Sequence, residues 1–90
     1  MSSELKVLRG EIEQIDQRIV NLIAQRVGVA REIAQAKCEA GAPLFDPARE
    51  AEVVRRAATC ARACAVDEET VRRIAWLMIG LCRQAQLEKS

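Results

Sequence analysis

The sequence predicts an all-α fold of three helices, the first of them long, and three observations carry that prediction. Apolar residues near the start of the chain recur in alternating steps of three and four, the period of one helix face. Two further segments each begin with an aspartate followed by residues that favour a first helical turn. Half of the residues are hydrophobic but only 2% are aromatic, so aliphatic side chains and alanine must form the core. That composition suits helices packed closely on helices.

The first helix is predicted over residues 4–38. Its apolar positions form a seam of the coiled-coil type: Leu5, Leu8, Ile12, Ile15, Ile19 and Leu22. The same register continues through Arg26, Val29, Ile33 and Ala36, so an arginine occupies a seam position. Such a helix is about 50 Å long, whereas a compact chain of this size has a radius of gyration of about 12 Å. The helix must therefore protrude, and a second copy of the chain is the expected cover for its seam, giving an intertwined homodimer.

A loop, EAGAPLFDP, ends the first pattern at Gly41 and Pro43. Asp46 and Pro47 then suit the N-cap and first position of a second helix, predicted over residues 47–63. Its core face is expected to carry Val53, Val54, Ala57, Ala58 and Ala61.

The third helix is predicted over residues 68–87, capped by Asp67, with two glutamates at its positive end. Its core face is expected to carry Val71, Ile74, Met78, Leu81 and Ala85. The chain shows no internal repeat, so residues 1–90 are expected to form one domain.

Charge and residue content exclude several classes of function. Fourteen Lys and Arg residues against thirteen Asp and Glu residues give a net charge of +1, which argues against electrostatic binding of nucleic acid. The absence of histidine removes the usual general base and the commonest metal ligand. The opening MSSELKVLRGEIEQ is charged from residue 4, so it resembles neither a signal peptide nor a membrane segment, and a cytoplasmic location is expected.

The four cysteines show no C-x-x-C pair, so neither a metal site nor another cofactor is expected. Free thiols are the simpler interpretation, with Cys60 and Cys64 packing on an alanine-rich face.

Several charged residues are spaced so that they can meet. Arg26 and Lys37 are eleven residues apart, so they face nearly the same way about 16 Å apart along the helix, and their long side chains can converge on one small anion. Arg9 lies seventeen residues before Arg26, about 25 Å away and turned by about 100°, which excludes it from that site within one chain. Across an antiparallel dimer, however, Arg9 can complete the pocket of the partner subunit.

Further polar residues follow on the other helices. Arg49 and Glu50 lie in a first turn beside the capping Asp46, and Cys82 shares a helix face with Gln86 at i,i+4. Taken singly, each has an ordinary structural explanation as a register-setting seam residue, a helix-dipole partner or a surface residue. Together they are candidate walls of one polar cavity.

Four motifs in order carry a resemblance: L-R-x-x-I near the start, LIAQRVGVAREIAQAK, DPARE after the Gly/Pro loop, and C-x-x-x-Q in the last helix. This set resembles the all-helical, AroQ-type chorismate mutases, and the match runs from Arg9 to Gln86. The resemblance implies an intertwined dimer and an isomerase that rearranges chorismate to prephenate for phenylalanine and tyrosine biosynthesis. The reaction is a unimolecular pericyclic shift without proton transfer, covalent intermediate or cofactor, which a chain without histidine can perform.

The resemblance also implies residue roles. Arg26 and Arg9 of the partner subunit would hold the substrate carboxylates, and Lys37 and Gln86 would face the ether oxygen. A neutral amide at Gln86 donates at any ordinary pH, so activity should be nearly flat from about pH 5 to 9.

At the other end of the substrate, Arg49 and Glu50 match positions near the ring hydroxyl, with Glu50 accepting its hydrogen bond, and Asp46 matches a neighbouring position. Cys82 departs from the family, because the bacterial relatives have a serine there that donates to the ring carboxylate. A thiol is a weaker donor, so some loss of substrate affinity is expected.

Three other functions remain open on the sequence. Isochorismate pyruvate lyase shares the fold, but its substrate would leave Glu50 without a partner. A mutase for 4-amino-4-deoxychorismate would let Glu50 pair with an amino group. A helical interaction module is the non-enzymatic alternative.

Overall fold

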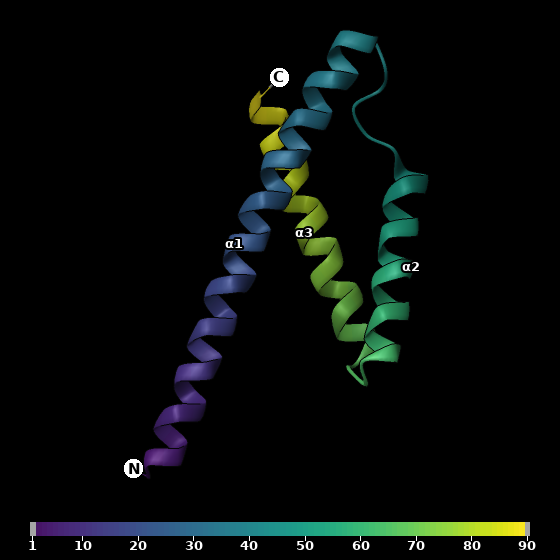
Figure 1. The fold of residues 1–90 in the computed structure, drawn as a ribbon. Coiled ribbons are helices and arrows are strands. Elements are labelled where there is room, and N and C mark those ends of the chain that lie inside the picture. The colour runs from purple at the N-terminus through teal and green to yellow at the C-terminus, as the bar shows by residue number, and fades with distance from the viewer. Residues whose placement is uncertain (1, 90) are drawn as a thin grey trace.

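The computed structural model describes residues 2–89, which form three helices, α1 (Ser3–Ala40), α2 (Pro47–Ala63) and α3 (Glu68–Lys89). No β-strand occurs within that range. Figure 1 shows α1 as a long rod whose C-terminal half lies against α3, with α2 on the other side of α3. The chain measures 58 × 25 × 15 Å and its radius of gyration is 16.7 Å. The all-α prediction is therefore confirmed, and the first helix protrudes as expected.

Both ends of α1 are capped by residues outside the helix. The Ser2 side chain accepts a hydrogen bond from the Leu5 backbone N–H at 3.2 Å. At the other end Gly41 adopts a left-handed conformation with φ of 66° and donates its N–H to the Cys38 carbonyl. Between these caps only Ala30 and Ala34 are buried, and the six predicted seam residues from Leu5 to Leu22 are 40% to 61% exposed. In the single chain, the seam of α1 is thus an uncovered apolar face.

The second helix begins and ends where the sequence predicts. The Asp46 carboxylate accepts a hydrogen bond from the Arg49 N–H at 3.1 Å, and Pro47 occupies the first turn. The core face is also confirmed, with three residues buried against α3 and two packed beside them: Val54, Ala58 and Ala61, then Val53 and Ala57.

The predicted core face of α3 is correct at Ala85 and wrong at Ile74 and Leu81. The buried positions are Ala75, Ile79, Cys82 and Ala85, whereas Ile74 and Leu81 are 50% and 43% exposed. Because α3 packs between α1 and α2, its contact face follows the positions where alanine lets the helices approach closely. Several larger side chains of α3, among them Ile74, Trp76 and Leu77, remain exposed.

The cysteines are all free, but only Cys82 is buried. The expectation that Cys60 and Cys64 pack in the core is wrong, since both are exposed. A helix turns about 100° per residue, which points Cys60 away from the face that buries Ala58. No group of three or more metal-binding side chains occurs among residues 2–89, and none of the helices there is both long and apolar enough to cross a membrane.

Candidate active site

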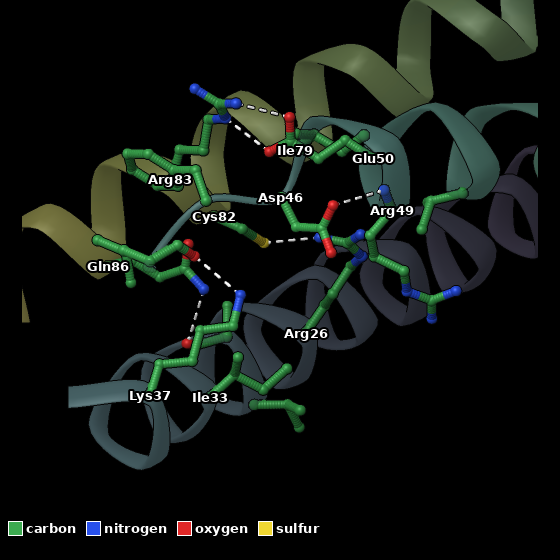
Figure 2. A pocket seen from close by; sticks show the side chains of 15 residues that line it. Arg26, Ile33, Lys37, Asp46, Arg49, Glu50, Ile79, Cys82, Arg83 and Gln86 are labelled. Atoms are coloured by element: carbon green, nitrogen blue, oxygen red, sulfur yellow. Dashed lines mark hydrogen bonds and ion pairs between the residues drawn. The ribbon is translucent and has the colours of Figure 1, made fainter. Parts of the chain in front are cut away.

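A cavity of about 460 Å³ lies between the C-terminal half of α1, the start of α2, the loop joining them and the C-terminal half of α3. Its volume falls in the range of about 300–1,000 Å³ that small-molecule sites occupy. Figure 2 shows the side chains of Arg26, Lys37, Cys82 and Gln86 around a common space. Seven of the eight predicted site residues line it: Arg26, Lys37, Asp46, Arg49, Glu50, Cys82 and Gln86.

Arg26 faces this cavity because the seam of α1 meets α3 there instead of another apolar helix face. The side chain is half-buried, and its Nη1 donates to the Sγ of the buried Cys82 at 2.8 Å. A thiol is a weak, uncharged acceptor. Arg26 is therefore positioned by α3 without its charge being neutralised.

Lys37 and Gln86 lie near the end of the cavity where α1 terminates (Figure 2). Lys37 Nζ donates to the Leu44 carbonyl in the loop at 2.9 Å. Gln86 Nε2 donates to the Ala30 carbonyl on α1 at 3.0 Å. Each of these bonds fixes its donor, and because an ammonium has three protons, Lys37 keeps protons for a ligand.

The start of α2 contributes three more polar residues. Asp46 faces the cavity while its carboxylate caps α2. The Arg49 side chain is 54% exposed, with Nη1 3.5 Å from a carboxylate oxygen of Glu52. The Glu50 side chain is only 16% exposed, so it is the acidic group that is turned most fully inward.

Arg83 is a cavity residue that the sequence interpretation missed. Its Nε and Nη2 each donate to one carboxylate oxygen of Glu50 at 2.6 Å, and its guanidinium lies over the Phe45 ring, 4.4 Å from the centroid. These hydrogen bonds hold the pKa of Glu50 below its ordinary value, against the opposing effect of burial. The available signal was its place on α3, three residues before Gln86, but its partner is 33 residues away in the chain.

The charges around the cavity favour a small anion. Four cations and two carboxylates line it, and Arg83 is matched by Glu50. Arg26 and Lys37 donate only to uncharged atoms, and no carboxylate among residues 2–89 forms an ion pair with either. Preorganised cations and amides of this kind bind carboxylates and stabilise developing negative charge.

The eighth predicted residue, Arg9, is exposed on the N-terminal part of α1 and does not line the cavity. This agrees with its separation from Arg26 along the helix, while its service to a partner subunit stays a prediction. The loop residues Leu44 and Phe45 are half-buried and line the cavity, so the loop forms part of the wall.

Comparisons with known proteins agree with the motif resemblance. The family model described as chorismate mutase type II matches residues 8–87. A chorismate mutase from Methanocaldococcus jannaschii is 33% identical over 79 residues, which cover 88% of this chain and 80% of the relative.

Two longer relatives match over most of this chain. A 3-dehydroquinate dehydratase from Pyrobaculum aerophilum is 30% identical over 92% of the chain. A bifunctional chorismate mutase/prephenate dehydratase from Escherichia coli is 32% identical over 99% of it. The chain spans about a quarter of the length of these two relatives, since the matched part is 24% of each.

Proposed function

The chain belongs to the chorismate mutase type II family, and from that premise we propose that its cavity binds chorismate and rearranges it to prephenate without acid, base or covalent catalysis. Membership makes the protein an isomerase of aromatic amino acid biosynthesis. The observation that carries the mechanistic proposal is the convergence of Arg26, Lys37 and Gln86 on one cavity in a chain without histidine. A cytoplasmic location for this activity stays a prediction from the sequence.

The reaction sets two requirements. One carbon–oxygen bond of the ether breaks while one carbon–carbon bond forms within the same molecule, so no proton has to move. The protein must hold the dicarboxylate in its folded, reactive conformer and stabilise the negative charge that grows on the ether oxygen. A cavity lined by cations and an amide that are fixed in advance supplies both.

At one end of the cavity, Arg26 would bind a substrate carboxylate through the two parallel N–H groups of its guanidinium. Lys37 and Gln86 would donate to the ether oxygen. Their bonds to the Leu44 and Ala30 carbonyls, at 2.9 and 3.0 Å, support this assignment because they fix both donors in advance of the reaction.

On the α2 side of the cavity, Glu50 would accept the hydrogen bond of the ring hydroxyl, with Arg49 and Asp46 close to it. Cys82 would face the ring carboxylate. Its sulfur already accepts from Arg26 at 2.8 Å, so the thiol and the guanidinium would reach that part of the substrate together.

The purified protein tests this function directly. Chorismate loss is followed by ultraviolet absorbance, the product is identified by chromatography, and isochorismate and 4-amino-4-deoxychorismate are run in parallel. Prephenate formation, with chorismate the preferred substrate, is the expected result. Pyruvate and salicylate from isochorismate alone would instead make the protein a lyase, and preference for the amino compound would make it a mutase for that substrate. Inertness toward all three would leave the helical interaction module as the better account.

The uncovered seam of α1 supports a homodimer as the working form. Its six apolar residues are 40% to 61% exposed in the single chain, and burying a face of this kind is the main force in association. In an antiparallel arrangement, Arg9 of the partner subunit would approach the middle of α1 and complete the set of carboxylate-binding groups.

Complementation between two inactive variants tests this arrangement. Arg9→Ala and Arg26→Ala are unfolded together and refolded as a mixture. If the site is shared, each mixed dimer has one intact site, so a statistical mixture should regain about a quarter of wild-type activity. No recovery, in a mixture shown to contain mixed dimers, would mean that Arg9 serves a site in its own chain or none.

A further inference from the structure

Arg83 is unlike the other cavity cations because it forms an ion pair with a carboxylate that itself lines the cavity. It donates two hydrogen bonds of 2.6 Å to Glu50 on α2, and it stacks on Phe45 in the loop before α2. One side chain of α3 thus connects two other segments of the wall.

Within the ion pair, the Glu50 carboxylate is more deeply buried than the Arg83 guanidinium. The Glu50 side chain is 16% exposed and that of Arg83 is 38% exposed. In Figure 2, Arg83 reaches Glu50 from the α3 side, while Arg26 and Lys37 come from the α1 side. A carboxylate has about four acceptor sites. Arg83 occupies one on each oxygen, which leaves acceptor sites for a ligand.

We propose that Arg83 is a positioning residue that holds Glu50 and Phe45 in place, and so sets the preference of the site for a substrate that carries a hydrogen-bond donor on its ring. This inference rests on the proposed function for the identity of the substrate. A carboxylate fixed from behind by a guanidinium accepts hydrogen bonds but donates none. A ring hydroxyl or ammonium at that position satisfies it, whereas a ring without a donor there leaves a half-buried charge short of a partner.

The effect of Arg83 should be on binding more than on the chemical step. The ring hydroxyl is on the carbon next to the one that carries the ether oxygen, but none of its own bonds breaks or forms, so its contact with Glu50 should be similar in the ground state and the transition state. Removing such a uniform interaction raises KM and leaves kcat unchanged. A residue that only supports the fold would instead lower the active fraction, which lowers kcat at constant KM.

The first experiment is steady-state kinetics of Arg83→Met, which keeps the long stem over Phe45 and removes the ion pair. We expect KM for chorismate to rise about ten- to a hundredfold, the effect of losing a hydrogen bond to a charged group, with kcat changed less than about threefold. Arg83→Lys should be intermediate, because it restores one of the two bonds. Arg72→Gln, which removes an ion-paired arginine from the exposed start of the same helix, is the matched control and should behave as wild type.

Two further variants distinguish a role of Arg83 in positioning Glu50 from a role in stabilising the fold. When Glu50→Gln is already present, Arg83→Met should raise KM little further, because Arg83 acts on the substrate through the Glu50 carboxylate. Phe45→Leu removes the stack and leaves the ion pair, so its KM should change less than that of Arg83→Met.

The pH dependence of KM is the third readout. Glu50 is faced by Arg83 on α3, by Asp46 at the cap of α2 and by Lys37 on α1. Without Arg83 the pKa of Glu50 should return toward 4.5, so KM of Arg83→Met should climb below about pH 5.5 while that of the wild type stays level.

The inference is overturned if Arg83→Met lowers kcat at unchanged KM, or if its effect is the same with and without Glu50. A urea-unfolding cycle of Arg83→Met, Glu50→Gln and the double variant distinguishes this failure from failure of the proposed function. Additive changes in that cycle would mean that the pair is not formed, whichever substrate the enzyme takes. If the cycle instead shows coupling and the wild-type protein is inert toward chorismate, the Glu50–Arg83 ion pair exists and the proposed substrate is wrong.

Discussion

Replacing Arg26 with leucine should separate the function of the α1 seam from its stability. The periodicity of α1 calls for an apolar residue at this position, and the structure instead directs a guanidinium into the cavity. Arg26→Leu therefore restores the regular seam while removing the group that we assign to a substrate carboxylate.

The loss of activity follows from the bonds that Arg26 would make. A bidentate contact with a carboxylate contains two charge-assisted hydrogen bonds, each worth about 1.5–3 kcal/mol. Losing both, about 3–6 kcal/mol, lowers kcat/KM by about 10² to 10⁴. The fold loses only the 2.8 Å contact between Arg26 Nη1 and Cys82 Sγ. Leucine is apolar and half-buried at this site, so stability should stay constant or rise by about 1 kcal/mol.

The assay measures kcat/KM for chorismate and the urea midpoint on the same preparations. Arg31→Leu is the matched control, because Arg31 lies on the same helix with a 46% exposed side chain, 4.0 Å from Glu88, and outside the cavity. It should retain activity. The reasoning is refuted if Arg26→Leu unfolds at markedly lower urea and keeps activity in proportion to its folded fraction, since Arg26 would then be a structural residue.

Three other changes test separate parts of the account. Cys82→Ser should lower KM by about two- to tenfold in steady-state kinetics, because a hydroxyl donates more strongly than a thiol; an unchanged KM would remove Cys82 from the substrate contacts. The wild type should keep a level kcat from about pH 5 to 9, whereas Gln86→Glu should lose at least about tenfold in kcat over that range, because only a protonated glutamate donates to the ether oxygen. A steep wild-type fall above pH 6 would contradict the role of Gln86. Hydrogen bonds from Thr70 hold the pKa of Asp67 below its ordinary 3.8. The stability that Asp67 contributes should therefore be present above that value and lost as pH falls through the lowered one. Urea unfolding should separate the wild type from Asp67→Ala at pH 7, with the difference shrinking as the pH falls below 3.8.

Helix positions were predictable because their signals are local. The cap and proline at Asp46 and Pro47 fix the start of α2, and both of its ends agree with the prediction. The ends of α1 and α3 fall within two residues of those expected. Which face of a helix is buried depends less on local signals, because it is set by the packing of the neighbouring helices. Because α3 packs against two helices, Ile74 is left exposed and the buried face instead carries Ala75, Ile79 and Cys82.

The cavity residues divide in the same way. Arg26 was identifiable because it interrupts a regular apolar seam, and the motif order brought Lys37 and Gln86 into the same set. Arg83 breaks no periodicity, and its partner Glu50 lies on another helix. Only the packing of α2 against α3 shows that the two meet. Likewise, the exposed position of Cys60 follows from the rotation of α2 and not from the residue type.

A crystal structure of the protein with bound prephenate tests the central claim most directly. The account predicts the diacid in the cavity between α1, α2 and α3, with one carboxylate held by Arg26, and Lys37 and Gln86 close to the oxygen released from the ether. It also predicts a two-fold dimer that brings Arg9 of the partner subunit to the second carboxylate. A ligand bound elsewhere, or a cavity in which Arg26 remains on Cys82 and contacts no carboxylate, would contradict it.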